Sequence, residues 1–161
     1  ANFQLVQFQK RLLTLFLKTK KILLLRNSDS GTREDADEAI NRASYMDTLT
    51  SLIGVPDIKV ITGIRRSGKS KLLESLRDFI EASLPNSNVI HINYNLNEFE
   101  GLLEYHELLA YVKEHRREGT QNFLLIDEVQ MCNGFERAIN SFHASEQYGI
   151  FITGERVLAV E

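Results

Sequence analysis

Short β-branched apolar runs alternate with longer amphipathic segments over most of this chain. Such runs are typical of strands buried in a parallel sheet, and the segments between them carry apolar residues at the three- and four-residue steps of helices. Strands are expected at residues 58–62, 89–94, 122–127 and 148–153. Helices are expected at about residues 34–52, 69–82, 102–118 and 135–145. The alternation predicts an α/β fold with a mainly parallel sheet and helical crossovers.

The N-terminal part of the chain differs in charge from the rest of it. Residues 1–33 contain seven Lys or Arg and one acidic residue, and apolar residues recur at helical spacing from Leu5 to Phe16. This pattern predicts a basic amphipathic helix, followed by a polar linker at residues 27–33. Such a helix can pack on another part of the protein, lie on a membrane surface or bind nucleic acid. We therefore divide the chain into an N-terminal segment and linker, residues 1–33, and a core, residues 34–161.

The cysteine content indicates a reducing compartment, and the hydropathy indicates that the chain does not cross a membrane. The single cysteine, Cys132, cannot form an internal disulfide, and no Cys and His residues have the spacing of a zinc site. No apolar stretch approaches the roughly eighteen residues that cross a bilayer, and no secretory cleavage pattern is present. We expect a cytoplasmic protein without a membrane span.

A glycine-rich segment follows the strand expected at residues 58–62. Residues 63–70 read GIRRSGKS and match the pattern GxxxxGK[ST] at the start of a helix. In such a loop the backbone N–H groups and the helix dipole favour phosphate, Lys69 is expected to reach the β- and γ-phosphates, and Ser70 is expected to bind Mg²⁺. A glycine-rich turn that only caps a helix is the structural alternative. The residues expected to contact the nucleotide are Gly63, Ile64, Arg65, Arg66, Ser67, Gly68, Lys69, Ser70 and Lys71.

Two carboxylates end the apolar run at residues 123–126. Asp127 and Glu128 follow this run, at the sheet edge where ligands of open α/β folds bind. Asp127 is expected to hold Mg²⁺ through water, and Glu128 is expected to orient or deprotonate the attacking water. Acidic residues often end strands, so the pair gains its meaning from the glycine-rich loop about sixty residues earlier.

Polar residues at two other strand ends are further candidates. Thr153 ends the strand at residues 148–153 and is expected to sense the γ-phosphate or position water, although it also fits a threonine that only ends a strand. Asn93, Asn95 and Asn97 could line the site, but turn chemistry explains them equally well. If the strand at residues 89–94 inserts between the loop-bearing strand and the acidic strand, the order is that of the additional-strand, catalytic-glutamate class of P-loop NTPases.

With these motifs in place, the chain resembles a known family. Residues 42–154 resemble the AAA-type ATPase domain of the prokaryotic AAA_14 family, in which a C-terminal region of unknown function often follows. The resemblance lies in residues 42–46 (RASYM), 60–70 (VITGIRRSGKS), 125–130 (LIDEVQ) and 151–154 (FITG). It implies a P-loop NTPase three-layer sandwich, ATP as the nucleotide and a cytoplasmic prokaryotic protein.

These features together predict an ATPase that binds ATP with Mg²⁺. Its hydrolysis is expected to drive a conformational change in attached or partner domains, or in a homo-oligomer. The alternative is a nucleotide-dependent switch with little turnover of its own, and a small-molecule kinase is a third reading. Nucleic acid as a partner is not supported beyond the basic N-terminal segment, because the whole chain carries a net charge of −3.

The end of the core departs from the family pattern. Only residues 154–156 separate two apolar runs, whereas a parallel crossover needs about a dozen residues or more. We therefore expect that a stretch of chain is missing between Gly154 and Glu155 and that the core is incomplete at its C-terminal end.

Overall fold

The computed structural model of the chain describes residues 21–25, 34–63 and 68–155. The helix predicted before residue 20 and the linker predicted at residues 27–33 lie outside these ranges. The boundary between an N-terminal segment and a core therefore stays a prediction.

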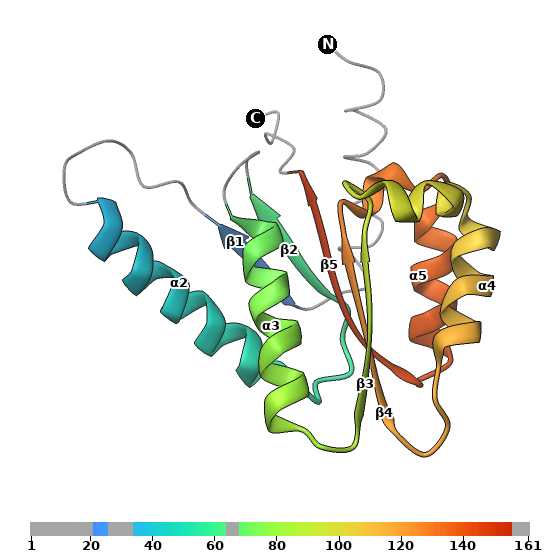
Figure 1. The fold of residues 1–161 in the computed structure, drawn as a ribbon, viewed down its shortest axis with the longest axis horizontal. Helices are drawn as coiled ribbons and strands as arrows, with labels where there is room; N and C mark the ends of the chain where they lie inside the picture. The colour runs from blue at the N-terminus through green and yellow to red at the C-terminus, as the bar shows by residue number, and fades with distance from the viewer. Residues whose placement is uncertain (1–20, 26–33, 64–67, 156–161) are drawn as a thin grey trace, which may run out of the picture.

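Five parallel strands form one sheet, in the order β1-β2-β5-β4-β3 (Figure 1). The strands are β1 (Lys21–Leu25), β2 (Lys59–Gly63), β3 (Ser87–Asn93), β4 (Gln121–Asp127) and β5 (Tyr148–Glu155). The four strands predicted from the apolar runs are confirmed, with small shifts at their ends. The edge strand β1 was not predicted, because its short apolar run directly follows a basic segment with helical spacing.

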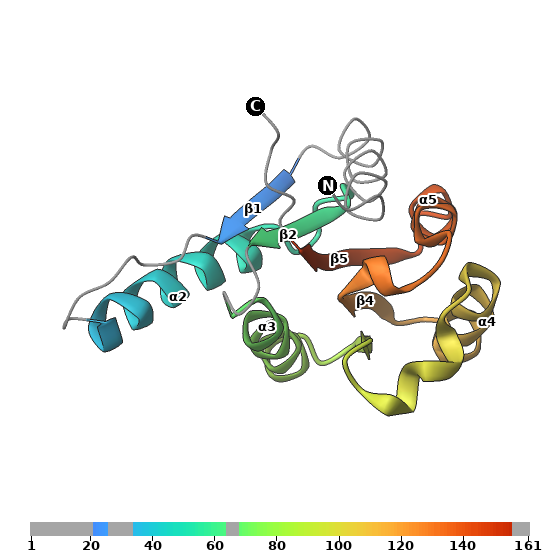
Figure 2. The same cartoon turned by 90° about the horizontal axis from the view of Figure 1, so that it is seen from above.

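Helices cover both faces of the sheet (Figure 2). On one face lie α2 (Glu34–Ser51) and α3 (Lys69–Ser83), and on the other lie α4 (Tyr105–His115) and α5 (Phe135–Ala144). Each pair of helices shares a separate apolar cluster with the sheet: Ile61 and Phe151 pack with the first pair, whereas Val60 and Ile152 pack with the second. Because strand side chains alternate between the two faces, neighbouring residues of one strand belong to different clusters. The fold is a three-layer α/β sandwich.

The helix predicted at residues 102–118 is shorter than expected. A 3₁₀ segment, η1 (Asn97–Leu102), precedes it, and α4 begins only at Tyr105. Glu104 caps this start: its side chain accepts a hydrogen bond from the backbone of Glu107, whose own carboxylate accepts one from Glu104 N at 3.2 Å. This reciprocal arrangement is a capping box, and Glu in place of the usual Ser or Thr concealed it in the sequence. Within the described ranges, no helix combines the length and the apolar character that a bilayer span requires.

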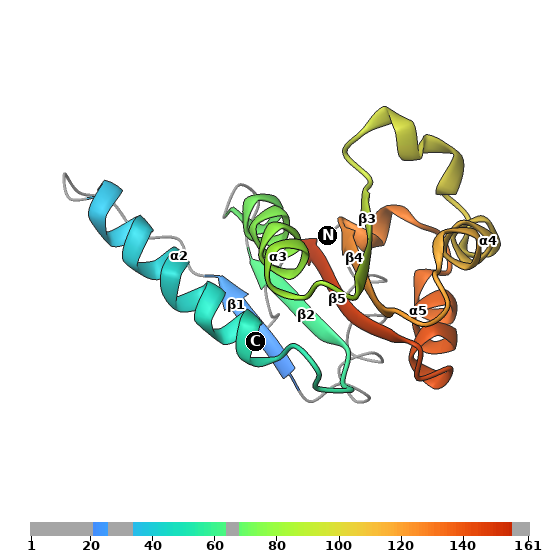
Figure 3. The ribbon, with the colours of Figure 1, turned by 60° about the horizontal axis from the view of Figure 1, so that its bottom comes forward.

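The strand order determines which strand ends are neighbours at the upper edge of the sheet in Figure 1. β5 lies between β2 and β4, and β3 is at the edge of the sheet beyond β4. The loop-bearing strand and the acidic strand are therefore not neighbours, but the strand that separates them is β5 and not the strand at residues 89–94. Figure 3 shows these strands from another side, with α3 beside the end of β2.

Candidate functional site

The start of α3 has the features of an anion-binding site. Gly68, the residue before the helix, has a left-handed backbone with φ of 87°, which glycine adopts without a steric penalty. The first turn of α3 contains no acidic residue, so nothing there offsets the positive end of the helix dipole. Lys69 is only 4% exposed, and Ser70 is half-buried beside it. Residues 64–67, which join β2 to Gly68, lie outside the described ranges.

The acidic end of β4 contains a buried carboxylate. Asp127 is completely buried, and its Oδ1 accepts a hydrogen bond from the Thr153 hydroxyl. Its second oxygen, Oδ2, is also buried and has no hydrogen-bond partner among the described residues. Leaving a buried carboxylate oxygen without a partner costs about 1–3 kcal/mol or more. The atom is thus suited to accept a hydrogen bond from a water molecule or to face a cation.

Thr153 connects β5 to both acidic residues at the end of β4. Its buried hydroxyl donates to Asp127 and accepts a hydrogen bond from the backbone N–H of Glu128, with an N···O distance of 3.0 Å. Thr153 lies inside β5, which continues to Glu155, and its hydroxyl is directed at the neighbouring strand. Whether it senses a γ-phosphate stays a prediction.

Glu128 has a backbone conformation that is uncommon for a side-chain-bearing residue. Its φ and ψ are 58° and 49°, in the left-handed region, and its side chain is half-buried. Such strained residues persist where surrounding contacts fix them, and they cluster at functional sites. Here the fixing contact is the bond from Glu128 N to Thr153. The chain then turns into the short 3₁₀ segment η2 (Val129–Met131).

Gln130 is a neighbour of the site to which no motif in the sequence assigned a role. Its side-chain Nε2 donates a hydrogen bond to Glu128 Oε2, and its own Oε1 is buried without a partner among the described residues. The only signal in the sequence was its place in the run LIDEVQ, two residues after Glu128. By contrast, Asn93 accepts a hydrogen bond from Asn95 N at 3.0 Å, which supports the turn reading of these two residues.

The ends of β2, β5 and β4 place the two halves of the site side by side. Neighbouring strands lie about 4.8 Å apart, so the end of β2 and the end of β4 are separated by about 10 Å, with β5 between them. In register, Gly63 pairs with Glu155 and Ile126 pairs with Ile152, which brings Asp127 level with Thr153. The start of α3 and the carboxylate of Asp127 therefore face one edge of the sheet.

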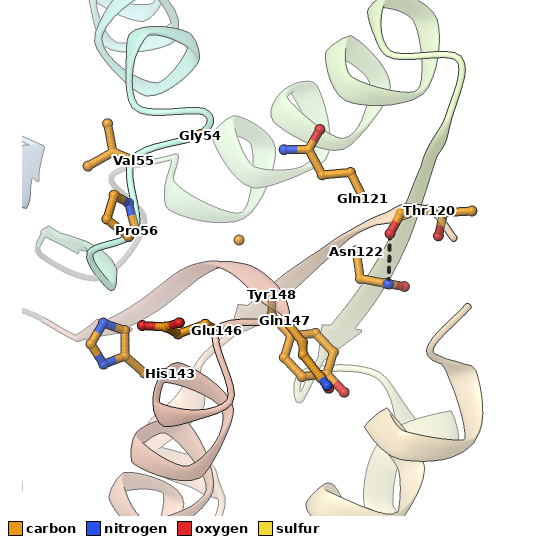
Figure 4. Close-up of a pocket in the computed structure, with 11 residues that line it drawn as sticks. Gly54, Val55, Pro56, Thr120, Gln121, Asn122, His143, Glu146, Gln147 and Tyr148 are labelled. Carbon is orange, nitrogen blue, oxygen red and sulfur yellow. Dashed lines mark hydrogen bonds between the residues drawn. The ribbon is translucent and has the colours of Figure 1, made fainter. Parts of the chain in front are cut away.

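A separate pocket of about 470 Å³ lies at the opposite edge, where strands β4 and β5 begin (Figure 4). Its walls are the turn at residues 54–56, the start of β4 at residues 120–122, and the end of α5 with the start of β5. In Figure 4 the side chain of Glu146 lies beside that of His143, and the side chain of Gln121 lies across the pocket from them. None of the predicted nucleotide-binding residues lines this pocket, because they all follow the carboxyl ends of strands.

Comparison with known proteins identifies the family. A family model described as an AAA domain, AAA_14, matches residues 55–159, a range that includes the glycine-rich loop, both carboxylates and Thr153. An uncharacterized protein of Haemophilus influenzae is 30% identical over 117 residues, which are 71% of this chain and 29% of that protein. The chain thus spans less than a third of the length of that relative. No solved structure matches the chain. The resemblance found in the sequence is confirmed, and the chain belongs to the AAA_14 family of AAA domains.

Proposed function

We propose that this domain binds ATP together with Mg²⁺ and hydrolyses the bond to the γ-phosphate. The observation that carries the proposal is the pairing of two features at one sheet edge. The first is a helix start with Gly68 and Lys69, and the second is the buried Asp127 with an unpartnered Oδ2 among the described residues. An AAA domain is expected to bind nucleotide, and this edge supplies groups for both the phosphates and the metal.

Phosphate binding is assigned to the loop from Gly63 to Lys71. The left-handed Gly68 and the uncompensated start of α3 support an anion at this position, because backbone N–H groups at a helix start point toward it. Lys69 would contact the β- and γ-phosphates. Arg65 and Arg66 lie in the part of the loop outside the described ranges, and their contacts with the nucleotide stay a prediction.

Mg²⁺ fits the oxygen ligands that this edge offers. Ser70 would bind the ion through its hydroxyl, and Asp127 would hold it through water at Oδ2. Among the described residues, no group of three or more His, Cys, Asp or Glu could hold a metal. Mg²⁺ usually keeps several waters and binds through one or two protein groups plus phosphate oxygens, which matches this sparse set. When bound, the ion would neutralise charge that develops on the phosphates.

Hydrolysis is assigned to Glu128 as the residue that orients and deprotonates the attacking water. Its carboxylate follows Asp127 directly, and its left-handed backbone turns it away from the direction of the strand. Thr153 supports it by holding the Glu128 N–H. The position of β5 between β2 and β4 supports the additional-strand, catalytic-glutamate class of P-loop NTPases. Coupling of hydrolysis to attached domains, to a protein partner or to a second copy is part of the proposal.

Two substitutions separate binding from hydrolysis. Lys69→Ala should weaken ATP binding severely, because it removes the buried ammonium group at the start of α3. Glu128→Gln should keep ATP affinity and lower turnover by about a hundredfold or more, since a general base contributes about 10²–10⁴. The exposed residues Lys113 and Glu114 provide matched controls, as Lys113→Ala and Glu114→Gln.

ATP affinity by calorimetry and phosphate release test these variants. If Glu128→Gln hydrolyses ATP as fast as the parent chain, the catalytic assignment is wrong. If the parent binds ATP tightly but releases phosphate no faster than ATP does without protein, the alternative of a nucleotide-dependent switch is favoured instead. If Lys69→Ala binds ATP like the parent, the phosphate site is wrongly assigned.

A further inference from the structure

The side chain of Gln130 holds one oxygen of the Glu128 carboxylate. Gln130 Nε2 donates the hydrogen bond and Glu128 Oε2 accepts it, and both side chains are half-buried. A hydrogen bond donated to an ionised carboxylate is stronger than one between neutral groups, and it restricts rotation of the carboxylate. The contact therefore fixes the direction of a carboxylate that would otherwise sample several rotamers.

The backbone between the two residues is held as well. Val129 is buried, the N–H of Met131 donates to Glu128 O at 3.0 Å, and the N–H of Cys132 donates to Val129 O at 3.1 Å. These bonds close the 3₁₀ turn η2, so Gln130 stands at a fixed position relative to Glu128. The contact is thus built into the turn that follows β4.

We propose that Gln130 is a positioning residue that aims the Glu128 carboxylate for hydrolysis. The proposal rests on the proposed function, in which Glu128 acts on the attacking water. An amide is suited to this task because it donates a hydrogen bond without competing for the proton. With Oε2 held by Gln130, the other carboxylate oxygen is the one that accepts the proton of water.

Two variants remove the donor in different ways. Gln130→Met keeps the length of the side chain and has no polar group, whereas Gln130→Ala removes the side chain beyond Cβ. Both should lower kcat by about tenfold, which is less than the roughly 10²–10⁴ that a general base contributes. ATP affinity should stay within about twofold of the parent. Gln147→Met is the matched control, because Gln147 is exposed and precedes β5 at the opposite sheet edge. It should leave kcat unchanged.

Phosphate release and ATP affinity are measured for these variants, and also for Glu128→Gln with and without Gln130→Met. If Gln130 acts through Glu128, Glu128→Gln and the double variant turn over at the same residual rate. If Gln130→Met does not fold, Gln130→Ala carries the same test. Parental kcat in the variants, a loss of ATP affinity, or a further fall in the double variant would overturn the positioning role. Parental turnover in Glu128→Gln would instead refute the catalytic assignment itself.

Discussion

The Thr153 hydroxyl makes hydrogen bonds with two consecutive residues at the end of β4. It donates to the carboxylate of Asp127 and accepts the N–H of Glu128, and all three groups lie at the end of the sheet. Without this acceptor the Glu128 N–H would need another partner, and the left-handed backbone at Glu128 would lose a fixing contact. One small polar side chain therefore stabilises the positions of both carboxylates.

Replacing Thr153 by Val should damage both stability and turnover. Val has the same shape but neither donates nor accepts a hydrogen bond, so we expect a loss of about 1–3 kcal/mol in the free energy of unfolding. Turnover should fall by about tenfold with little change in ATP affinity, because Glu128 is less well oriented. Urea unfolding and phosphate release measure the two effects. Thr153→Ser keeps the hydroxyl and is the control, and equal behaviour of the two variants would contradict this role.

The sequence predicted some site residues and missed others for a physical reason. The glycine-rich loop and the Asp127-Glu128 pair are set by local spacing, so a motif identifies them. The contacts of Thr153 depend on β5 lying beside β4, and the contact of Gln130 depends on the left-handed turn at Glu128. The first is a tertiary feature that no single segment encodes, and the second is a local contact that requires a backbone conformation which motif spacing does not reveal.

At the scale of elements, apolar periodicity predicted the types and approximate ends of the helices and strands, but not which strands are neighbours in the sheet. The four core strands and the helices α2, α3 and α5 agree with the patterns, because each buries one stripe or face against the sheet. The insertion of β5 between β2 and β4 was not predicted, since local patterns do not state which parallel strands pair. β5 continues through Glu155, so the expected missing stretch after Gly154 stays a prediction.

The loop between α2 and β2 is tied to the sheet by a buried lysine. The ammonium of Lys59 donates to the carbonyl of Val55 and lies 4.8 Å from the centre of the Phe151 ring. The side chain is only 2% exposed, and this burial lowers the pKa of Lys59 to about 8, against the opposing effect of the nearby Asp57.

Lys59→Met should therefore change how the stability of the domain depends on pH. The folded pKa of about 8 lies below the unfolded value of 10.5, so the unfolded chain binds more protons between these values and stability rises with pH there. Met has no such proton, so any gain in the free energy of unfolding of the variant over the parent should be larger at pH 7 than at pH 10, by about 1–3 kcal/mol. Urea unfolding of parent and variant at both pH values measures this gain. The exposed Lys113→Met is the control, and a gain that does not depend on pH would contradict the assignment.

At the scale of the whole molecule, the sheet places the candidate nucleotide site at one edge and the 470 Å³ pocket at the other. Three strand ends contribute to the nucleotide site, and the helices on both faces hold those strands in register. This chain spans 29% of the length of its Haemophilus influenzae relative, so what the proposed nucleotide cycle would drive is a question that experiments on that longer relative can address. The proposed ATPase and the alternative switch both require that the phosphate chain of the nucleotide binds between α3 and β4.

A crystal structure with Mg²⁺ and a non-hydrolysable ATP analogue tests this requirement most directly. We expect the β- and γ-phosphates to lie against the backbone of residues 63–70 and the Lys69 ammonium. We also expect the metal beside Ser70, with a water between the ion and Asp127 Oδ2. An analogue bound at another place, such as the pocket around Gln121 and Glu146, with nothing at the start of α3, would contradict the proposed nucleotide site.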